Sequence, residues 1–228
     1  MQFVDFKNTH AMLMATVDRY RDQPAYRWFT APGQTESVTW GEFNNQVRQV
    51  AKSLMTLGVE PGDKVNIMSY SCYRWVLTDM GIMSAGAVTV GIYQSNLPKD
   101  CQYIIDHSDT KFLFGEGQEE VDKALSIFKE CPKLKKIIWD DPKGMRHYDD
   151  PILTYFKDIE KLGRELAAEQ PGLFDEMISC LTPDDVGMIN YTSGTTGLPK
   201  GSMITQKNMV AVARLQDAVD AARQDFEY

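Results

Sequence analysis

Residues 64–92 read KVNIMSYSCYRWVLTDMGIMSAGAVTVGI, which is a short apolar run, an amphipathic stretch and a second apolar run. The apolar runs at 64–69 and 87–92 predict buried strands, and the stretch at 73–85 predicts a helix between them. The same alternation continues, with helices expected over 99–107 and 118–129 and strands over 111–114 and 136–139. Strand–helix alternation at this spacing predicts an α/β fold with a largely parallel sheet and helices on both faces.

Boundary signals flank this alternating region. Apolar residues at helical spacing over 10–20 follow a candidate N-cap at Thr9. Thr39 and Glu42 have the spacing of a capping box, which predicts that a further helix begins there. After the last strand pattern the sequence becomes less regular, and we expect a single helix over 152–166 in that region.

Composition limits the classes of function. The chain has 228 residues and a formal net charge of −8, from 24 Lys and Arg against 32 Asp and Glu. This length holds one large domain or two small ones, and 43% hydrophobic residues are ordinary for a globular protein. A net negative chain repels phosphate backbones, so we expect no nucleic-acid partner. The four cysteines and three histidines are too widely spaced to predict a metal site.

No targeting or membrane-spanning segment is visible in the sequence. The N-terminal residues lack a basic stretch followed by an apolar one, so no secretory signal is expected. The apolar residues near 80–92 are interrupted by Ser84, Gly86 and Thr89 and are too short to span a bilayer. We therefore expect a cytoplasmic protein, with peripheral membrane contact through a surface patch as an open alternative.

A loop rich in glycine and hydroxyl groups follows the short strand expected over 186–191. Residues 191–201 read YTSGTTGLPKG. The glycines let backbone amides converge on an anion, and Lys200 adds a mobile positive charge. Hydroxyl groups can donate to phosphate oxygens or ligate Mg²⁺, and here they come from Thr192, Ser193, Thr195 and Thr196.

Two interpretations of this loop compete. Its composition also fits a solvated Ser/Thr/Gly linker, but the preceding strand and the single lysine favour a cradle for a triphosphate at the carboxyl edge of the sheet. The spacing matches neither G-x-x-x-x-G-K-[ST] nor G-x-G-x-x-G, so the chain has neither a Walker loop nor a dinucleotide-binding fingerprint.

Residues 191–209, YTSGTTGLPKGSMITQKNM, closely resemble the phosphate-binding motif of the adenylate-forming enzymes. This superfamily includes acyl-CoA synthetases, firefly luciferase and nonribosomal adenylation domains. The resemblance extends over residues 37–69 and 80–116, and it spans most of residues 10–210. Residues 92–109, IYQSNLPKDCQYIIDHSD, together with 133–141, are most similar to the long-chain fatty-acyl-CoA synthetases.

The resemblance implies a ligase that activates a carboxylic acid, here a long-chain fatty acid, in two steps. The carboxylate attacks the α-phosphate of MgATP, which gives an acyl-adenylate and pyrophosphate, and coenzyme A then displaces AMP. ATP, Mg²⁺ and coenzyme A are therefore the expected small-molecule partners. The alternatives are an adenylating enzyme for another carboxylate, and a truncated, non-catalytic relative that binds a nucleotide or a partner.

Carried over to this sequence, the resemblance assigns the loop to the β- and γ-phosphates of ATP. Lys200 is the expected catalytic residue because it would neutralise the departing pyrophosphate, and Thr192 is the expected Mg²⁺ contact. The expected phosphate-binding residues are Thr192, Ser193, Gly194, Thr195, Thr196, Gly197 and Lys200, with Gly194, Gly197 and Gly201 serving the backbone geometry. Many relatives have a histidine where this chain has Gln206.

The resemblance also implies that residues 1–228 form the N-terminal part of the family's large AMP-binding domain. Residues 1 to about 185 would form a βα subdomain, and 186–228 the strand, the phosphate-binding loop and a following helix. In the family, the adenine site, the ribose site, an acidic Mg²⁺ ligand and a C-terminal domain lie beyond this point. On this interpretation the C-terminal domain is absent and the segment alone does not complete adenylation.

Overall fold

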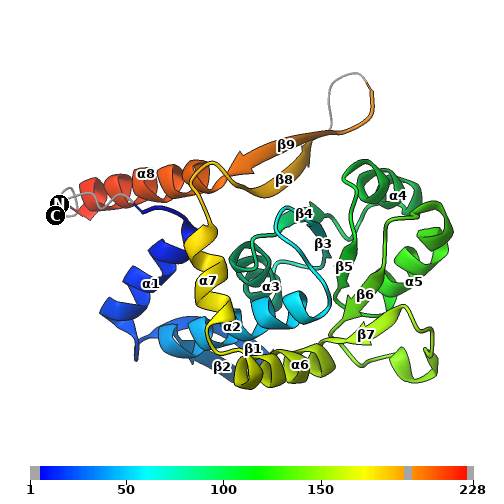
Figure 1. Ribbon diagram of the computed structural model, residues 1–228, viewed down its shortest axis with the longest axis horizontal. Coiled ribbons are helices and arrows are strands. Elements are labelled where there is room, and N and C mark those ends of the chain that lie inside the picture. The colour runs from blue at the N-terminus through cyan, green and yellow to red at the C-terminus, as the bar shows by residue number, and fades with distance from the viewer. Residues whose placement is uncertain (1–5, 193–196, 225–228) are drawn as a thin grey trace.

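A computed structural model describes residues 6–192 and 197–224 of the chain. A central sheet lies between two groups of helices (Figure 1). The elements are, in chain order, α1 (Thr9–Tyr20), β1 (Pro24–Ala31), β2 (Gln34–Thr39), α2 (Trp40–Thr56), β3 (Lys64–Met68), α3 (Tyr73–Ser84), β4 (Val88–Ile92), α4 (Pro98–His107), β5 (Phe112–Gly115), α5 (Gln118–Ile127), β6 (Lys136–Trp139), β7 (Leu153–Tyr155), α6 (Phe156–Glu169), α7 (Leu173–Cys180), β8 (Val186–Thr192), β9 (Lys200–Thr205) and α8 (Gln206–Gln224).

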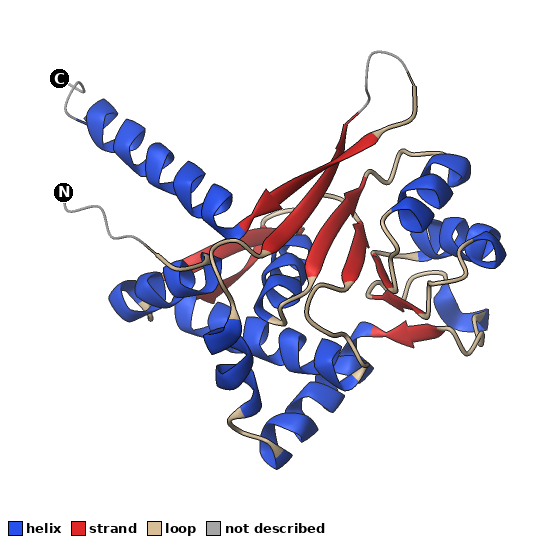
Figure 2. Cartoon of the chain, turned by 45° about the horizontal axis from the view of Figure 1, so that its top comes forward, coloured by secondary structure: helices blue, strands red, loops and turns tan. Residues whose placement is uncertain are grey.

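Among the described residues, seven strands form one sheet in the order β7-β6-β5-β3-β4-β8-β9. Every neighbouring pair in this sheet is parallel except β8 and β9, which form an antiparallel hairpin at the edge. β1 and β2 form a separate antiparallel hairpin. The predicted α/β fold with a largely parallel sheet is confirmed, and the strands and helices can be followed in Figure 2.

Helices cover both faces of the sheet. Ile67 and Phe114 pack in a buried cluster with residues of α2, α3 and α6. Met68 and Leu113, one position away along the same strands, pack with residues of α4 and α5 instead. Because successive side chains of a strand point to opposite faces, the apolar runs of β3 and β5 serve two cores at once.

Two local signals at the helix starts had different outcomes. The predicted capping box is confirmed, because the Thr39 amide donates to Glu42 at 2.8 Å and the Glu42 amide donates to the Thr39 hydroxyl at 3.2 Å. The predicted N-cap at Thr9 is wrong. Asn8 caps α1, and its side chain accepts a 2.8 Å hydrogen bond from the Ala11 amide.

Residues 140–185 hold more regular structure than the sequence predicts. The helix expected over 152–166 begins only at Phe156, because residues 153–155 form β7 and pair in parallel with β6. α7 was also not predicted. Finally, none of the helices in the described part of the chain combines the length and apolar character needed to cross a bilayer.

Candidate active site

The β8–β9 hairpin carries the loop that the sequence singles out. β8 is parallel to β4, so the loop leaves the sheet at the carboxyl ends of the parallel strands, where ligands of α/β proteins bind (Figure 1). The expectation of one continuous loop over 191–201 is wrong at its ends. Thr192 ends β8 and Lys200 begins β9, and the hairpin register places these two residues directly opposite each other.

The hairpin register brings together Thr192, the predicted Mg²⁺ contact, and Lys200, the predicted catalytic residue. Side chains at opposite positions of an antiparallel pair share one face of the sheet, with their Cβ atoms about 5 Å apart. Thr192 and Lys200 are both exposed, so both can reach a ligand at the mouth of the loop. The other predicted phosphate-binding residues, apart from Gly197, lie outside the described residues, namely Ser193, Gly194, Thr195 and Thr196.

Two glycines shape the returning side of the loop for different reasons. Gly197 has a φ of +126°, a conformation that side chains with a Cβ rarely adopt, and a Cβ there would meet nothing within 4 Å. At Gly201 the limit is space, because a Cβ would lie 2.9 Å from Cγ2 of Ile189 on β8. The first glycine permits a turn and the second permits close contact between the two strands.

Helix α4 contacts both ends of the loop. The Tyr103 hydroxyl donates a 2.9 Å hydrogen bond to the carbonyl oxygen of Pro199. Nδ1 of His107 lies 2.7 Å from the hydroxyl oxygen of Tyr191. Burial raises the pKa of Tyr191, so its hydroxyl stays protonated at neutral pH. The sequence patterns singled out neither Tyr103 nor His107 as a site residue, although their spacing of four residues in a predicted helix places them on one helix face.

The chain after the hairpin is fixed by polar contacts. The side-chain oxygen of Asn208 accepts hydrogen bonds from the Thr205 amide at 3.0 Å and from the Thr205 hydroxyl at 2.8 Å, at the start of α8. Between them, Gln206 is buried, and its Oε1 accepts from the Thr9 amide and hydroxyl. The position where many relatives have histidine is therefore engaged with α1 in this chain.

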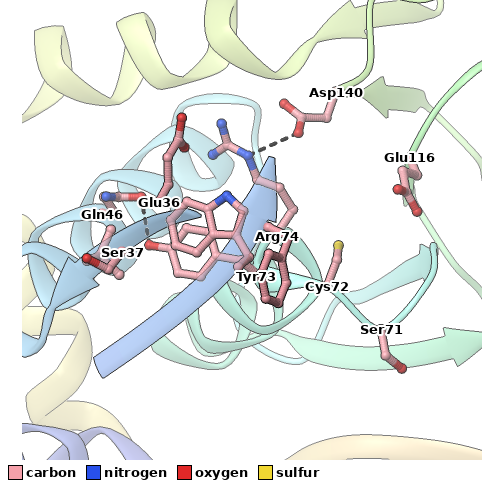
Figure 3. Close-up of a pocket in the computed structure, with 12 residues that line it drawn as sticks. Glu36, Ser37, Gln46, Ser71, Cys72, Tyr73, Arg74, Glu116 and Asp140 are labelled. Carbon is pink, nitrogen blue, oxygen red and sulfur yellow. Dashed lines mark hydrogen bonds and ion pairs between the residues drawn. The ribbon is translucent and has the colours of Figure 1, made fainter. Parts of the chain in front are cut away.

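A separate cavity of about 760 Å³ lies at the carboxyl ends of β3, β5 and β6, under the β1–β2 hairpin (Figure 3). Trp28 and Tyr73 stack in its wall with ring centroids 4.4 Å apart. Arg74 forms an ion pair with Asp140 at 3.0 Å, which opposes the rise in the pKa of Asp140 that burial causes. None of the predicted site residues that are described lines this cavity.

The donor set for a metal is small. Within the described residues, no group of three or more His, Cys, Asp or Glu side chains is arranged to hold an ion. The Thr192 hydroxyl is a single oxygen donor, which fits Mg²⁺ that arrives bound to triphosphate and keeps several waters. It does not fit a metal held by the described protein residues alone.

Comparisons with known proteins identify a matching family and several similar proteins. The profile of a family described as AMP-binding enzyme matches residues 13–227. The long-chain-fatty-acid–CoA ligase ACSBG1 of Bos taurus is 30% identical over 209 residues, covering 91% of this chain and 28% of that protein. The long-chain-fatty-acid–CoA ligase FadD15 of Mycobacterium bovis is 31% identical over 192 residues, covering 83% and 30%. This chain thus spans less than a third of these curated relatives.

A solved structure shows the same fold. The anthranilate CoA ligase AuaEII, in complex with anthranoyl-AMP, matches with a TM-score of 0.68 at 24% sequence identity. The match covers 90% of this chain and 36% of that one. At this identity the likeness concerns the arrangement of strands and helices and extends to almost all of this chain.

Proposed function

Because this chain belongs to the AMP-binding enzyme family, we propose that it forms the phosphate-binding part of an ATP-dependent ligase that makes acyl-adenylates and acyl-CoA. Residues 1–185 are its βα subdomain, and 186–228 carry the strand, the loop and the following helix. The names of the similar long-chain-fatty-acid–CoA ligases support a long-chain fatty acid as the acid substrate. ATP with Mg²⁺ and coenzyme A are the other substrates.

The observation that carries the proposal is the pairing of Thr192 with Lys200 across the mouth of the loop. In the first step the substrate carboxylate attacks the α-phosphate, the bond from the α-phosphorus to the bridging oxygen breaks, and pyrophosphate leaves with the bond's electrons. Negative charge therefore grows on the β- and γ-phosphates. A lysine and hydroxyl donors aimed at them stabilise the transition state more than the bound ATP.

The predicted phosphate-binding residues divide the work of this step between them. Lys200 would neutralise the departing pyrophosphate, and the Thr192 hydroxyl would bind a phosphate oxygen or the Mg²⁺ that accompanies ATP. Ser193, Gly194, Thr195, Thr196 and Gly197 supply further hydroxyl and backbone amide donors between them. Mg²⁺, when bound, supplies additional positive charge on the same phosphates.

The test is acid-dependent exchange of pyrophosphate into ATP by the full-length gene product at saturating ATP. Lys200→Ala is expected to lower the exchange rate by about 30- to 1,000-fold, because such contacts contribute roughly 2–4 kcal/mol in the transition state. Lys207→Ala is the matched control, since Lys207 is exposed and pairs with Asp184. Equal rates for wild type and Lys200→Ala would remove Lys200 from the mechanism.

The acid substrate is tested in the same assay. Palmitate is expected to drive exchange, whereas acetate and anthranilate are expected to drive it far more weakly. Exchange that depends on anthranilate or acetate instead would replace the fatty acid by an aryl or short-chain acid. Binding of MgATP without exchange for any acid would favour a non-catalytic relative.

A further inference from the structure

Helix α4 is anchored firmly enough to serve as a fixed support. Cys101, Ile104 and Ile105 are all at most 3% exposed and pack into the core on one face of the sheet. Tyr103 and His107, four residues apart, lie together on the helix surface with their rings stacked at a centroid distance of 5.2 Å. Both side chains contact the β8–β9 hairpin, in which most residues are exposed or half-buried.

The two contacts reach the residues that precede Thr192 and Lys200. His107 bonds to Tyr191, directly before Thr192, and Tyr103 bonds to the carbonyl of Pro199, directly before Lys200. The Tyr191 ring also meets the Tyr103 ring edge-on, at 6.3 Å between centroids. Both described ends of the loop are therefore attached to one helix.

The returning end of the loop needs such support. Pro199 has no amide hydrogen, so it cannot donate a bond to a neighbouring strand. Pairing of β8 with β9 begins only at Lys200. The Tyr103 hydroxyl donates a hydrogen bond to the Pro199 carbonyl, one residue before that pairing begins. A second hydrogen bond attaches the end of the loop next to Thr192. There the protonated Tyr191 hydroxyl can donate to Nδ1 of His107 when that nitrogen is unprotonated.

We propose that Tyr103 and His107 are positioning residues of the proposed ligase, which hold the two ends of the phosphate-binding loop in the arrangement that binds ATP. This inference rests on the proposed function. A preorganised loop loses less conformational freedom when the triphosphate binds, so the attachment raises affinity for ATP. It acts equally on bound ATP and on the transition state, in contrast to Lys200, whose contribution grows as pyrophosphate leaves.

The test compares KM and kcat for the full-length gene product in pyrophosphate exchange. Tyr103→Phe removes one hydroxyl and is expected to raise the KM for ATP about 3- to 10-fold, with kcat and the KM for the acid unchanged. Tyr148→Phe is the matched control, because its hydroxyl bonds to Asp122 and Gln118 away from the hairpin. This control is expected to leave the KM for ATP at the wild-type value.

A second pair of variants separates positioning from packing. His107→Leu is expected to raise the KM for ATP by a similar factor, whereas His107→Asn, which keeps a hydrogen-bonding atom near the place of Nδ1, is expected to restore most of the affinity. Equal KM values for Tyr103→Phe, His107→Leu and wild type would overturn the inference. So would a failure of His107→Asn to differ from His107→Leu.

The failure of this inference is distinguishable from failure of the proposed function. If Lys200→Ala abolishes exchange while the α4 variants keep the wild-type KM for ATP, only the positioning role falls. If the protein shows no exchange, the dissociation constant of MgATP from the full-length gene product is measured by calorimetry instead. Tyr103→Phe must then weaken binding by the same factor, and unchanged binding would overturn the inference.

Discussion

A single side-chain oxygen joins the start of the last helix to the start of the first: Oε1 of Gln206 lies 2.7 Å from the Thr9 hydroxyl and 3.0 Å from the Thr9 amide. The two residues are separated by 197 positions in the sequence, and both are buried. Gln206 begins α8 directly after the hairpin, so this contact attaches the base of the hairpin to α1. The Thr9 side chain thus contacts Gln206, while Asn8 caps α1.

Replacing Gln206 is expected to destabilise the fold. Gln206→Leu leaves the Thr9 amide and hydroxyl without their acceptor, and an unsatisfied buried donor costs about 1–3 kcal/mol. The free energy of unfolding, measured by urea denaturation, is therefore expected to fall by about 2 kcal/mol. The neighbouring Lys207→Leu, at an exposed position, is expected to change it by less than about 0.5 kcal/mol. Equal effects of the two substitutions would contradict the role assigned to Gln206.

Gly163 is expected to tolerate no side chain. It lies where α6 packs on α2, and a Cβ there would stand 2.2 Å from the Ser53 hydroxyl oxygen and 2.5 Å from the Gln49 carbonyl oxygen. In an open helix, Gly→Ala stabilises by about 1 kcal/mol. Gly163→Ala is instead expected to lower the free energy of unfolding by about 2 kcal/mol, because the two helices must separate.

The control for that prediction is Gly172→Ala. A Cβ at Gly172 would meet nothing nearer than 3.7 Å, so no comparable loss is expected. Chemical denaturation of both variants, at one pH and temperature, gives the comparison. A Gly163→Ala protein as stable as wild type would show that α2 and α6 do not approach as closely as described.

The buried Asp79 carboxyl group is expected to lower the free energy of unfolding as the pH rises. Burial raises its pKa from 3.8 to about 6, so the folded chain prefers the protonated carboxyl group. The resulting stabilisation is present below pH 3.8 and is lost as the pH rises through 6, by an amount on the order of 3 kcal/mol. Asp79→Asn is therefore expected to be more stable than wild type at pH 8 and similar to it at pH 4.

The exposed Asp18 provides the matched control for charge. Asp18→Asn removes the same charge without a burial cost, so its stability relative to wild type is expected to change little between pH 4 and pH 8. The measurement is the midpoint of urea unfolding across that range. A constant difference between Asp79→Asn and wild type at every pH would rule out the assigned titration.

The buried His10 ring is expected to lower the free energy of unfolding as the pH falls, the opposite of Asp79. Burial lowers its pKa from 6.5 to about 4, with Nδ1 lying 3.2 Å from the Ser84 hydroxyl oxygen. The folded chain prefers the neutral ring, so the stability associated with it is present above pH 6.5 and is lost as the pH falls towards 4. His10→Gln is expected to remove about 3 kcal/mol of this pH dependence. An unchanged slope between pH 6.5 and 4 would contradict the burial of an uncharged ring.

Local patterns in the sequence were sufficient for much of the fold. The apolar runs of β3, β4, β5 and β6, the helices between them and the Thr39–Glu42 capping box all depend on residues a few positions apart. The glycines, hydroxyl groups and lysine of residues 192–200 also fit a solvated linker, so the preceding strand and the resemblance to a family motif were needed to predict a phosphate-binding loop there. The family match extends well beyond the loop, over residues 13–227.

Tertiary structure decided the features that join distant residues. β7 is only three residues long and has no recognisable strand pattern in its sequence. It is a strand because it pairs with β6. The return of β9 onto β8 places Lys200 opposite Thr192. The bonds from α4 span 84 and 96 positions, and the bond between Thr9 and Gln206 spans 197. Periodicity and capping are properties of neighbouring residues, whereas these contacts depend on which surfaces meet when the sheet and its helices pack.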